Sequence, residues 1–227
     1  REIILDTETT GLDPKQGHRL IEIGCIEVVN FIKTGRVFHT YINPERDVPE
    51  DAFRIHGIAT EFLKDKPTFH EVNAEFLDFI EDSPLVIHNA GFDIKFINAE
   101  LASVRKEHIP VKRTIDTLLL ARKKFPGAPA TLDALCKRFG IDLSKRTKHG
   151  ALLDADLLAD VYMELMGGSQ PKMELHMLET NVVRETLIIN KSRQKRAPRV
   201  FFLKEEELRA HQAFLEKIKN PLWNTNL

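Results

Sequence analysis

The sequence contains little cysteine and no long apolar stretch. Among its 227 residues there are two cysteines, Cys25 and Cys136, which lie far apart in the chain. This excludes a disulfide-bonded scaffold and is typical of a reducing compartment, so we expect a cytoplasmic location. The longest apolar runs, such as Leu118–Ala121, are much shorter than the roughly 20 residues of a membrane-spanning helix. We therefore expect no membrane partner.

Two common classes of site are also missing from the sequence. The isolated cysteines do not offer the ligand spacing of a zinc site. There is no glycine-rich loop of the Walker type, which argues against hydrolysis of nucleoside triphosphates. What remains is an ordinary globular composition, with 42% hydrophobic and 30% charged residues, enough for one sizeable core.

Charge is distributed unevenly along the chain. Residues 1–166 contain 22 basic and 27 acidic residues, a net charge of −5, whereas residues 167–227 contain 11 and 7, a net charge of +4. The change coincides with chain-breaking and small polar residues from Gly167 to Pro171. We therefore predict a compact domain over residues 1–166, a linker over residues 167–183 and a tail over residues 184–227.

The hydrophobic pattern of the first domain predicts a mixed α/β sheet. We expect strands at residues 2–6, 20–30, 37–42 and 84–88. We expect helices at residues 69–80, 91–104, 131–139 and 150–166. The first three strands form an antiparallel meander, with a turn predicted at Lys33–Gly35. Strands that alternate with helices after this meander are typical of a sheet covered by helices.

Acidic residues occur where the pattern predicts a core. Asp6 and Glu8 end the first strand two positions apart, so their side chains point to the same side. Asp154 falls on the apolar face of the last helix, where an unpaired carboxylate costs on the order of several kcal/mol. Asp93 repeats this pattern less cleanly. A solvated strand end, a buried salt bridge or a helix cap would explain each acid separately, and a metal site would explain them together.

Other polar residues accompany these acids. His149 directly precedes the last helix, and the segment 88–91 follows the fourth strand, where polar residues commonly line a site. A structural or exposed role for this histidine is the alternative to a functional one. If the four acids meet at one edge of the sheet, their charge requires neutralisation. Two divalent cations with oxygen ligands, such as Mg²⁺, would provide it.

Three segments together resemble the motifs of the DEDDh family of exonucleases. They are LDTETTG at residues 5–11, HNAGFD at 88–93 and HGALLDA at 149–155. The segments at 53–58, 65–69 and 132–136 also resemble the bacterial proofreading members of this family. The likeness covers essentially the whole chain. It implies a ribonuclease H-like mixed sheet and 3′→5′ exonuclease activity that releases nucleoside 5′-monophosphates.

The resemblance also implies roles for individual residues. Two divalent cations, Mg²⁺ or Mn²⁺, would be bound by Asp6, Glu8, Asp154 and, mostly through water, Asp93. His149 would act as the general base. The positions that match those holding the 3′-terminal nucleotide are Thr9, Ile55, His56 and Phe92.

The tail points to protein partners. The segment 170–175 resembles a peptide that binds the sliding clamp, with contacts from Gln170, Met173 and Leu175. It departs from the usual pattern at Pro171 and at Leu175, where phenylalanine is common, and a plain linker is the alternative. A strand at 200–203 and a helix at 205–218 carry an apolar face too small to form a core. The resemblance implies that this tail binds the catalytic subunit of a replicative polymerase.

The expected substrate is the 3′ end of DNA, single-stranded or frayed. A domain of net charge −5 attracts a polyanion weakly, so a partner would have to deliver that end. Two alternatives stay open. An RNA-trimming DEDDh exonuclease of the oligoribonuclease or ribonuclease T type would share the metal chemistry but usually lacks such a tail. A non-catalytic scaffold would share only the fold, and the intact set of acids argues against it.

Overall fold

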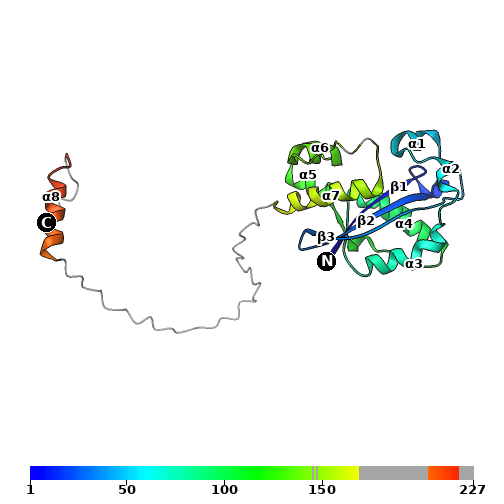
Figure 1. Ribbon diagram of the computed structural model, residues 1–227, viewed down its shortest axis with the longest axis horizontal. Helices are drawn as coiled ribbons and strands as arrows, with labels where there is room; N and C mark the ends of the chain where they lie inside the picture. Colours follow the sequence, from blue (N-terminus) through cyan, green and yellow to red (C-terminus); the bar gives the residue numbers. More distant parts are fainter. Residues whose placement is uncertain (145, 147, 169–203, 220–227) are drawn as a thin grey trace, which may run out of the picture. The chain divides into compact units, whose positions relative to one another are not determined.

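The computed structural model describes residues 1–144, 146, 148–168 and 204–219. The chain divides into two compact units, residues 1–174 and residues 175–227. Within the described part of the first unit, a five-stranded sheet has the order β3-β2-β1-β4-β5. Figure 1 labels three of its strands, β1, β2 and β3. Across the described residues we find no helix of the length and apolarity that crossing a bilayer requires.

The sheet is the mixed one that the sequence predicts. The meander consists of β1 (Glu2–Thr9), β2 (Leu20–Val29) and β3 (Ile32–Tyr41), paired antiparallel. Strand β4 (Leu85–Ile87) pairs parallel with β1, and β5 (Thr114–Asp116) pairs parallel with β4. The carboxyl ends of β1, β4 and β5 therefore lie at one edge, where the predicted site residues follow.

The turn between β2 and β3 lies earlier than predicted. The prediction of a turn at Lys33–Gly35 is wrong, because these residues belong to β3. The chain reverses at Asn30 and Phe31, whose φ angles are 51° and 66°. Two residues in the left-handed region give a tight hairpin that matches the twist of its strands. A contact between the rings of Phe31 and Tyr162, with centroids 5.6 Å apart, helps to offset the strain of the positive φ.

Helices cover both faces of the sheet. One face packs against α3 (Phe69–Ile80) and α4 (Ala90–Ser103), and alternate residues of β1, such as Ile3 and Leu5, contribute to that core. Ile4 points to the opposite face, which is covered by α5 (Thr117–Lys124), α6 (Leu132–Phe139) and α7 (Ala151–Met166). The side chains of Asp6 and Glu8 share the side of Ile4, because residues two apart on a strand point the same way.

Four of these helices confirm the sequence prediction to within a residue or two at each end. Thr131 caps α6 as expected, since its hydroxyl accepts a hydrogen bond from the Ala134 amide at 3.3 Å. The prediction missed several short elements. These are β5 and α5 together with α1 (Glu50–His56), α2 (Thr60–Leu63) and the 3₁₀ helices η1 (Pro14–Gln16) and η2 (Val111–Arg113).

The described part of the second unit contains helix α8 (Glu205–Leu215), where the sequence predicts a helix. Leu208 and Phe214 leave 45% and 60% of their surface exposed. The predicted strand at 200–203 and the clamp-binding segment at 170–175 lie outside the described residues. The boundaries proposed for the linker and the tail stay predictions.

Candidate active site

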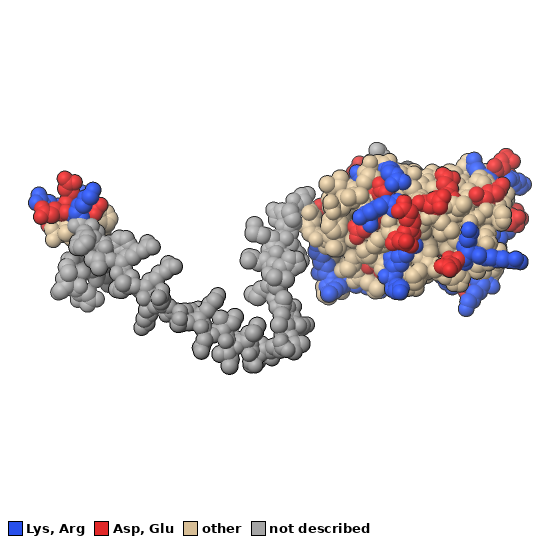
Figure 2. Space-filling model, turned by 90° about the horizontal axis from the view of Figure 1, so that it is seen from below, with Lys and Arg blue, Asp and Glu red and all other residues tan. Residues whose placement is uncertain are grey.

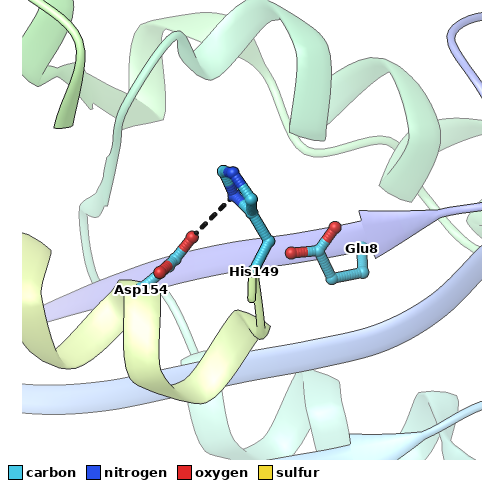
Figure 3. Close-up of side chains that lie close together, drawn as sticks. All are labelled: Glu8, His149 and Asp154. Atoms are coloured by element: carbon cyan, nitrogen blue, oxygen red, sulfur yellow. Dashed lines mark hydrogen bonds and ion pairs between the residues drawn. The ribbon is translucent and has the colours of Figure 1, made fainter. Parts of the chain in front are cut away.

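Residues from two distant segments meet beside the end of β1. Glu8 projects from β1, Asp154 lies in the first turn of α7, and His149 stands just before that helix (Figure 3). One ligand atom of each side chain lies within 4.8 Å of those of the other two. The Glu8 carboxylate points toward the pair formed by His149 and Asp154, whose Nδ1 and Oδ2 atoms are 3.2 Å apart. The chain thus brings together three of the residues that the sequence predicts for the site.

Asp93 reaches the same region from the opposite face of the sheet. It lies in the first turn of α4 and is 3% exposed. Its Oδ1 accepts a hydrogen bond of 2.7 Å from the hydroxyl of Thr7, the residue between Asp6 and Glu8. Burial raises the pKa of Asp93 to about 7, even though the Thr7 hydrogen bond lowers it. The bond fixes α4 to the strand that carries the other two acids.

The carboxylates on β1 resist ionisation. Burial raises the pKa of Glu8 to about 8, and the nearby charges of Asp154, Glu22 and Asp93 act in the same direction. Burial, followed by the charges of Asp93 and Glu8, also holds the pKa of Asp6 well above its usual value. Crowded carboxylates of this kind would ionise readily beside a cation. The donor set is oxygen-rich, as Mg²⁺ and Mn²⁺ prefer, so these residues fit the expected metal ions.

The cost of burying the Asp154 carboxylate is offset in a different way, by a cationic side chain. The guanidinium of Arg146 donates to both of its carboxylate oxygens, from Nε at 2.6 Å and from Nη2 at 2.7 Å. Burial alone would raise the pKa of Asp154, but the hydrogen bonds from Arg146 and His149 hold it below its usual value. Arg146 also contacts His149 Nδ1 at 2.8 Å and Asp133 Oδ1 at 2.6 Å. Its guanidinium therefore places a positive charge at one edge of the acidic group, which consists of Asp6, Glu8, Asp93 and Asp154.

Sequence reasoning missed Arg146. It precedes His149 by three residues in a basic segment that resembles many solvated charge runs. The loop geometry that places its side chain on Asp154 leaves no periodic signal in the sequence. An acid on an apolar helix face does require a partner, and that requirement was the one available indication of a nearby cation.

A cavity of about 490 Å³ opens beside Glu8. Its lining includes the four residues predicted to hold a terminal nucleotide, Thr9, Ile55, His56 and Phe92. The backbone amide of His149 donates to the Ile55 carbonyl at 3.3 Å, which connects this wall to the segment before α7. The structure thus brings the predicted binding residues together next to the acids.

His56 has a special position in this cavity wall. It is 6% exposed, and its Nδ1 accepts a hydrogen bond of 3.0 Å from the Ile58 amide. Burial lowers the pKa of His56 to about 4, so the ring is neutral at pH 7 and its proton resides on Nε2. Among the described residues this buried Nε2 finds no hydrogen-bond partner. A buried donor without a partner in the protein is well suited to an acceptor on a ligand.

A further cavity, of about 580 Å³, opens on the other side of the acids. Asp6 and Asp154 line it together with Arg146 and His149. The acidic group therefore lies between two open spaces, one on the Glu8 side and one on the Asp154 side. Of the remaining site predictions, Gln170, Met173 and Leu175 lie outside the described residues.

Comparison with known proteins identifies the class of activity. The model of the exonuclease family RNase_T matches residues 3–162. The DNA polymerase III epsilon subunit of Rickettsia felis is 57% identical over 223 residues, which cover 96% of each chain. The same subunit of Escherichia coli K12 is 50% identical over 229 residues, with 96% of this chain and 93% of the relative covered.

Solved structures of exonucleases share the fold of this chain. Exonuclease X in complex with a 5′-overhanging DNA duplex is 26% identical, with a TM-score of 0.57 over 73% of this chain and 91% of that one. The nuclease domain of 3′hExo, a DEDDh family member bound to rAMP, has a TM-score of 0.63 over 72% and 90% of the two chains. At 21% identity it supports the ribonuclease H-like fold alone.

These findings confirm the expected class of protein. The chain is a metal-dependent 3′→5′ exonuclease of the proofreading kind, and its relatives favour this activity over RNA trimming or a non-catalytic role. The chain belongs to the RNase_T exonuclease family and, within it, to the family of bacterial DNA polymerase III epsilon subunits.

Proposed function

We propose that this site hydrolyses the last phosphodiester bond at the 3′ end of a DNA strand, on behalf of a replicative polymerase. The observation that carries the proposal is the meeting of Asp6, Glu8, Asp93 and Asp154 beside an exposed His149. The pKa values of Glu8 and Asp93 are raised to about 8 and about 7. Ionisation of these two acids is therefore unfavourable unless a cation binds beside them. The reaction releases nucleoside 5′-monophosphates.

The proposed metal ions are two Mg²⁺ or Mn²⁺ ions held by the acids. Asp6, Glu8 and Asp154 would bind them directly, and Asp93 would act through water. When bound, such ions polarise the phosphate and stabilise charge on the attacking and leaving oxygens. The protein contributes the rigid placement of the ligands, because β1, α4 and α7 are joined by buried contacts on both sides of the sheet.

His149 is the proposed general base. Its side chain is 47% exposed, so water can reach the ring, and Asp154 Oδ2 lies 3.2 Å from Nδ1. A neutral imidazole can accept a proton from an attacking water molecule near neutral pH. Asp154 holds the His149 ring in place. The Ile55 carbonyl accepts a hydrogen bond from the His149 amide and so fixes the backbone of His149.

The 490 Å³ cavity is the proposed site for the terminal nucleotide. Phe92 and Ile55 supply apolar surface against which a base can pack. The Nε2–H group of His56 can donate a hydrogen bond to an oxygen of the nucleotide, which would satisfy the buried donor described above. The Thr9 hydroxyl already donates to the Gly11 carbonyl at 2.6 Å, so its oxygen remains available as an acceptor.

DNA supply is assigned to the polymerase. On the face of the first unit that Figure 2 shows, the described residues intersperse basic and acidic side chains without a broad basic patch. Phosphate neutralisation dominates non-specific DNA affinity. The relatives are named as subunits of DNA polymerase III. The exposed apolar side chains of Leu208 and Phe214 on α8 support polymerase binding by this helix. A cytoplasmic location and clamp binding by residues 170–175 complete the proposal.

The nuclease proposal can be tested with the full chain, Mg²⁺ and 5′-labelled oligonucleotides. We expect single-stranded DNA to shorten stepwise from its 3′ end and to release 5′-monophosphates. Faster degradation of RNA of the same sequence would instead favour an RNA-trimming enzyme. His149→Ala is expected to lower the rate about 100- to 10,000-fold and to abolish the acid limb of the pH–rate profile while Mn²⁺ still binds. An unchanged acid limb would assign the base elsewhere.

The polymerase proposal needs a separate test. A double variant, Leu208→Ser with Phe214→Ser, is expected to lose co-purification with the polymerase catalytic subunit. Ala213→Ser, on the other side of α8, serves as the matched control and should bind normally. Retention of the double variant at full strength would show that α8 does not make the contact.

A further inference from the structure

Helix α7 begins without a capping side chain of its own. Its N-cap residue is Gly150, which offers no side-chain acceptor for the first amides of the helix. An acceptor comes instead from another part of the chain, because the Ala151 amide donates to Glu22 Oε2 at 3.1 Å. The two residues are separated by 129 positions. A negative charge at this place also interacts favourably with the helix dipole.

Glu22 is itself held firmly on β2. It is 3% exposed, and in the antiparallel register it lies directly opposite Glu8 of β1. Its other carboxylate oxygen, Oε1, lies 2.7 Å from His39 Nε2 on β3. Glu22 therefore connects the start of α7 to both neighbours of the strand on which it sits. Both of its oxygens are engaged by groups of the protein.

Gly24 explains why a strand residue can reach the helix terminus. A Cβ atom at this position would lie 2.4 Å from the Leu152 nitrogen and 2.5 Å from the Ala151 carbonyl carbon. Such distances are well inside van der Waals contact, so only glycine allows α7 to begin directly on β2. Because Glu22 and Gly24 are two residues apart, they share the face that the helix covers.

The hydrogen bond between Glu22 and the Ala151 amide lies between two residues of the candidate site. His149 lies two residues before Ala151, and Asp154 lies three residues after it. A shift of the first turn of α7 would move both of them relative to Glu8, which is fixed on β1. We propose that Glu22 is a positioning residue, which sets the place of His149 and Asp154 by capping α7 from the neighbouring strand. The inference rests on the proposed function, since it assigns these two residues to the active site.

The test compares Glu22→Ala with Glu22→Gln in the full chain. The alanine variant is expected to lower kcat about 10- to 100-fold, as is typical when a group that orients ligands is lost, with little change in the KM for single-stranded DNA. The glutamine variant should recover most of the rate, because its amide oxygen can still accept from the Ala151 N–H. Exchange of the Ala151 amide, followed by NMR, should accelerate in Glu22→Ala and stay slow in Glu22→Gln.

Glu27 provides a matched control on the same strand. It is also buried, at 4% exposure, but pairs with Arg1 and Arg36 rather than with α7. Glu27→Ala should lower thermal stability without lowering kcat or altering exchange of the Ala151 amide. Equal losses of kcat in Glu27→Ala and Glu22→Ala would overturn the inference, because general destabilisation would then explain both.

Two further outcomes separate this inference from the proposed function. Wild-type kcat and slow Ala151 exchange in Glu22→Ala, together with inactivity of Asp6→Ala, would overturn the positioning role alone. Normal turnover in Asp6→Ala would overturn the proposed active site itself, whatever Glu22 does. Parallel losses of kcat and of amide protection in Glu22→Ala, with rescue of both by glutamine, would support the positioning role.

Discussion

Asp93 and Asp154 approach the end of β1 from opposite faces of the sheet, equally buried at 3% exposure but compensated in opposite ways. Asp93 receives a hydrogen bond from the neutral hydroxyl of Thr7, and burial raises its pKa to about 7. Asp154 receives two from the cationic Arg146, and its pKa lies below the usual value in spite of burial. Burial raises the pKa of both carboxylates, and the charge of the partner decides whether the final pKa lies above or below the usual value.

This difference shows what neutralises the site in the metal-free protein. On the side of β1 and α4, bound protons reduce the charge of the carboxylates, as the raised pKa values of Glu8 and Asp93 indicate. On the side of α7, a guanidinium does so. Divalent cations would replace both, so metal binding should release protons from one side and the Arg146 contact from the other. Single substitutions can change one side of the site at a time.

Removal of Asp154 is expected to have the largest effect. Asp154→Ala should lower the nuclease rate by about 1,000-fold or more, because loss of a ligand removes several kcal/mol of transition-state stabilisation. It also leaves Arg146 without its main partner, so the metal-free protein should lose stability. Steady-state hydrolysis of single-stranded DNA and thermal unfolding measure the two effects.

Asp156 supplies the control for that experiment. It lies on the same helix but its side chain is 50% exposed and pairs with Lys33. Asp156→Ala should keep nearly the full nuclease rate. Comparable activity losses in the two variants would show that the position on the helix, and with it the assignment of Asp154, is irrelevant to catalysis.

Arg146→Gln would leave Asp154 on α7 without a cationic partner, as Asp93 on α4 already is. Without the guanidinium, Asp154 should show a raised pKa, and the metal-free protein should unfold at a lower temperature. Mn²⁺ affinity should rise about 10-fold, since charge-assisted hydrogen bonds worth about 1.5–3 kcal/mol no longer compete with the metal. Isothermal titration calorimetry of the metal measures this directly.

A second arginine separates this effect from a change in net charge. Arg138 lies over the Phe125 ring rather than at the acids, with 4.5 Å between its guanidinium carbon and the ring centroid. Arg138→Gln removes the same charge and should leave Mn²⁺ affinity unchanged. If Arg146→Gln weakened metal binding instead, the guanidinium would be supporting the site rather than competing for it.

The sequence predicts the acids better than their partners, and the reason is physical. Strand alternation places Asp6 with Glu8, and helical periodicity separates buried Asp154 from exposed Asp156, because each pattern is local. Arg146 and Glu22 act through contacts across the fold. The contact between Glu22 and Ala151 depends on the close approach that Gly24 permits, which is a tertiary property without a sequence period.

The same distinction applies to the fold. The sequence predicts the meander and the longer helices, where many residues follow one period. It misplaces the hairpin turn, because Phe31 adopts a positive φ that few residues other than glycine favour. It misses β5, a strand of three residues, since such a short segment carries too little pattern. Local signals therefore locate the catalytic acids, while the arrangement around them emerges only in three dimensions.

Because bound protons reduce the charge of the carboxylates on the side of β1 and α4, we expect an unusual pH dependence of stability. For Glu8 and Asp93 the folded pKa values of about 8 and about 7 exceed the unfolded values of roughly 4, so the folded state binds more protons. The contribution of these two groups to the free energy of unfolding is fully present below about pH 4 and is lost as the pH rises to about 8. Between about pH 6.5 and pH 8 the metal-free protein should therefore lose several degrees in Tm, because His56, whose pKa falls to about 4 in the folded state, contributes the opposite slope only below that range. Saturating Mg²⁺ should remove this loss, and a Tm that rises over the same range without metal would contradict the assignment.

The smallest expected effect comes from Thr7→Val, which removes the neutral partner of Asp93 at nearly constant volume. The buried carboxylate then lacks its 2.7 Å donor, so its pKa should rise further and stability should fall by about 1–2 kcal/mol. Turnover should fall only a few-fold at pH 8, because Asp93 acts through water in the proposed mechanism, and the loss should deepen below pH 7. Thr40→Val, which removes a hydroxyl that donates to the Tyr41 carbonyl on β3, is the matched control. A loss for Thr7→Val as large as that for Asp154→Ala would show that the two sides of the acidic group contribute equally to catalysis.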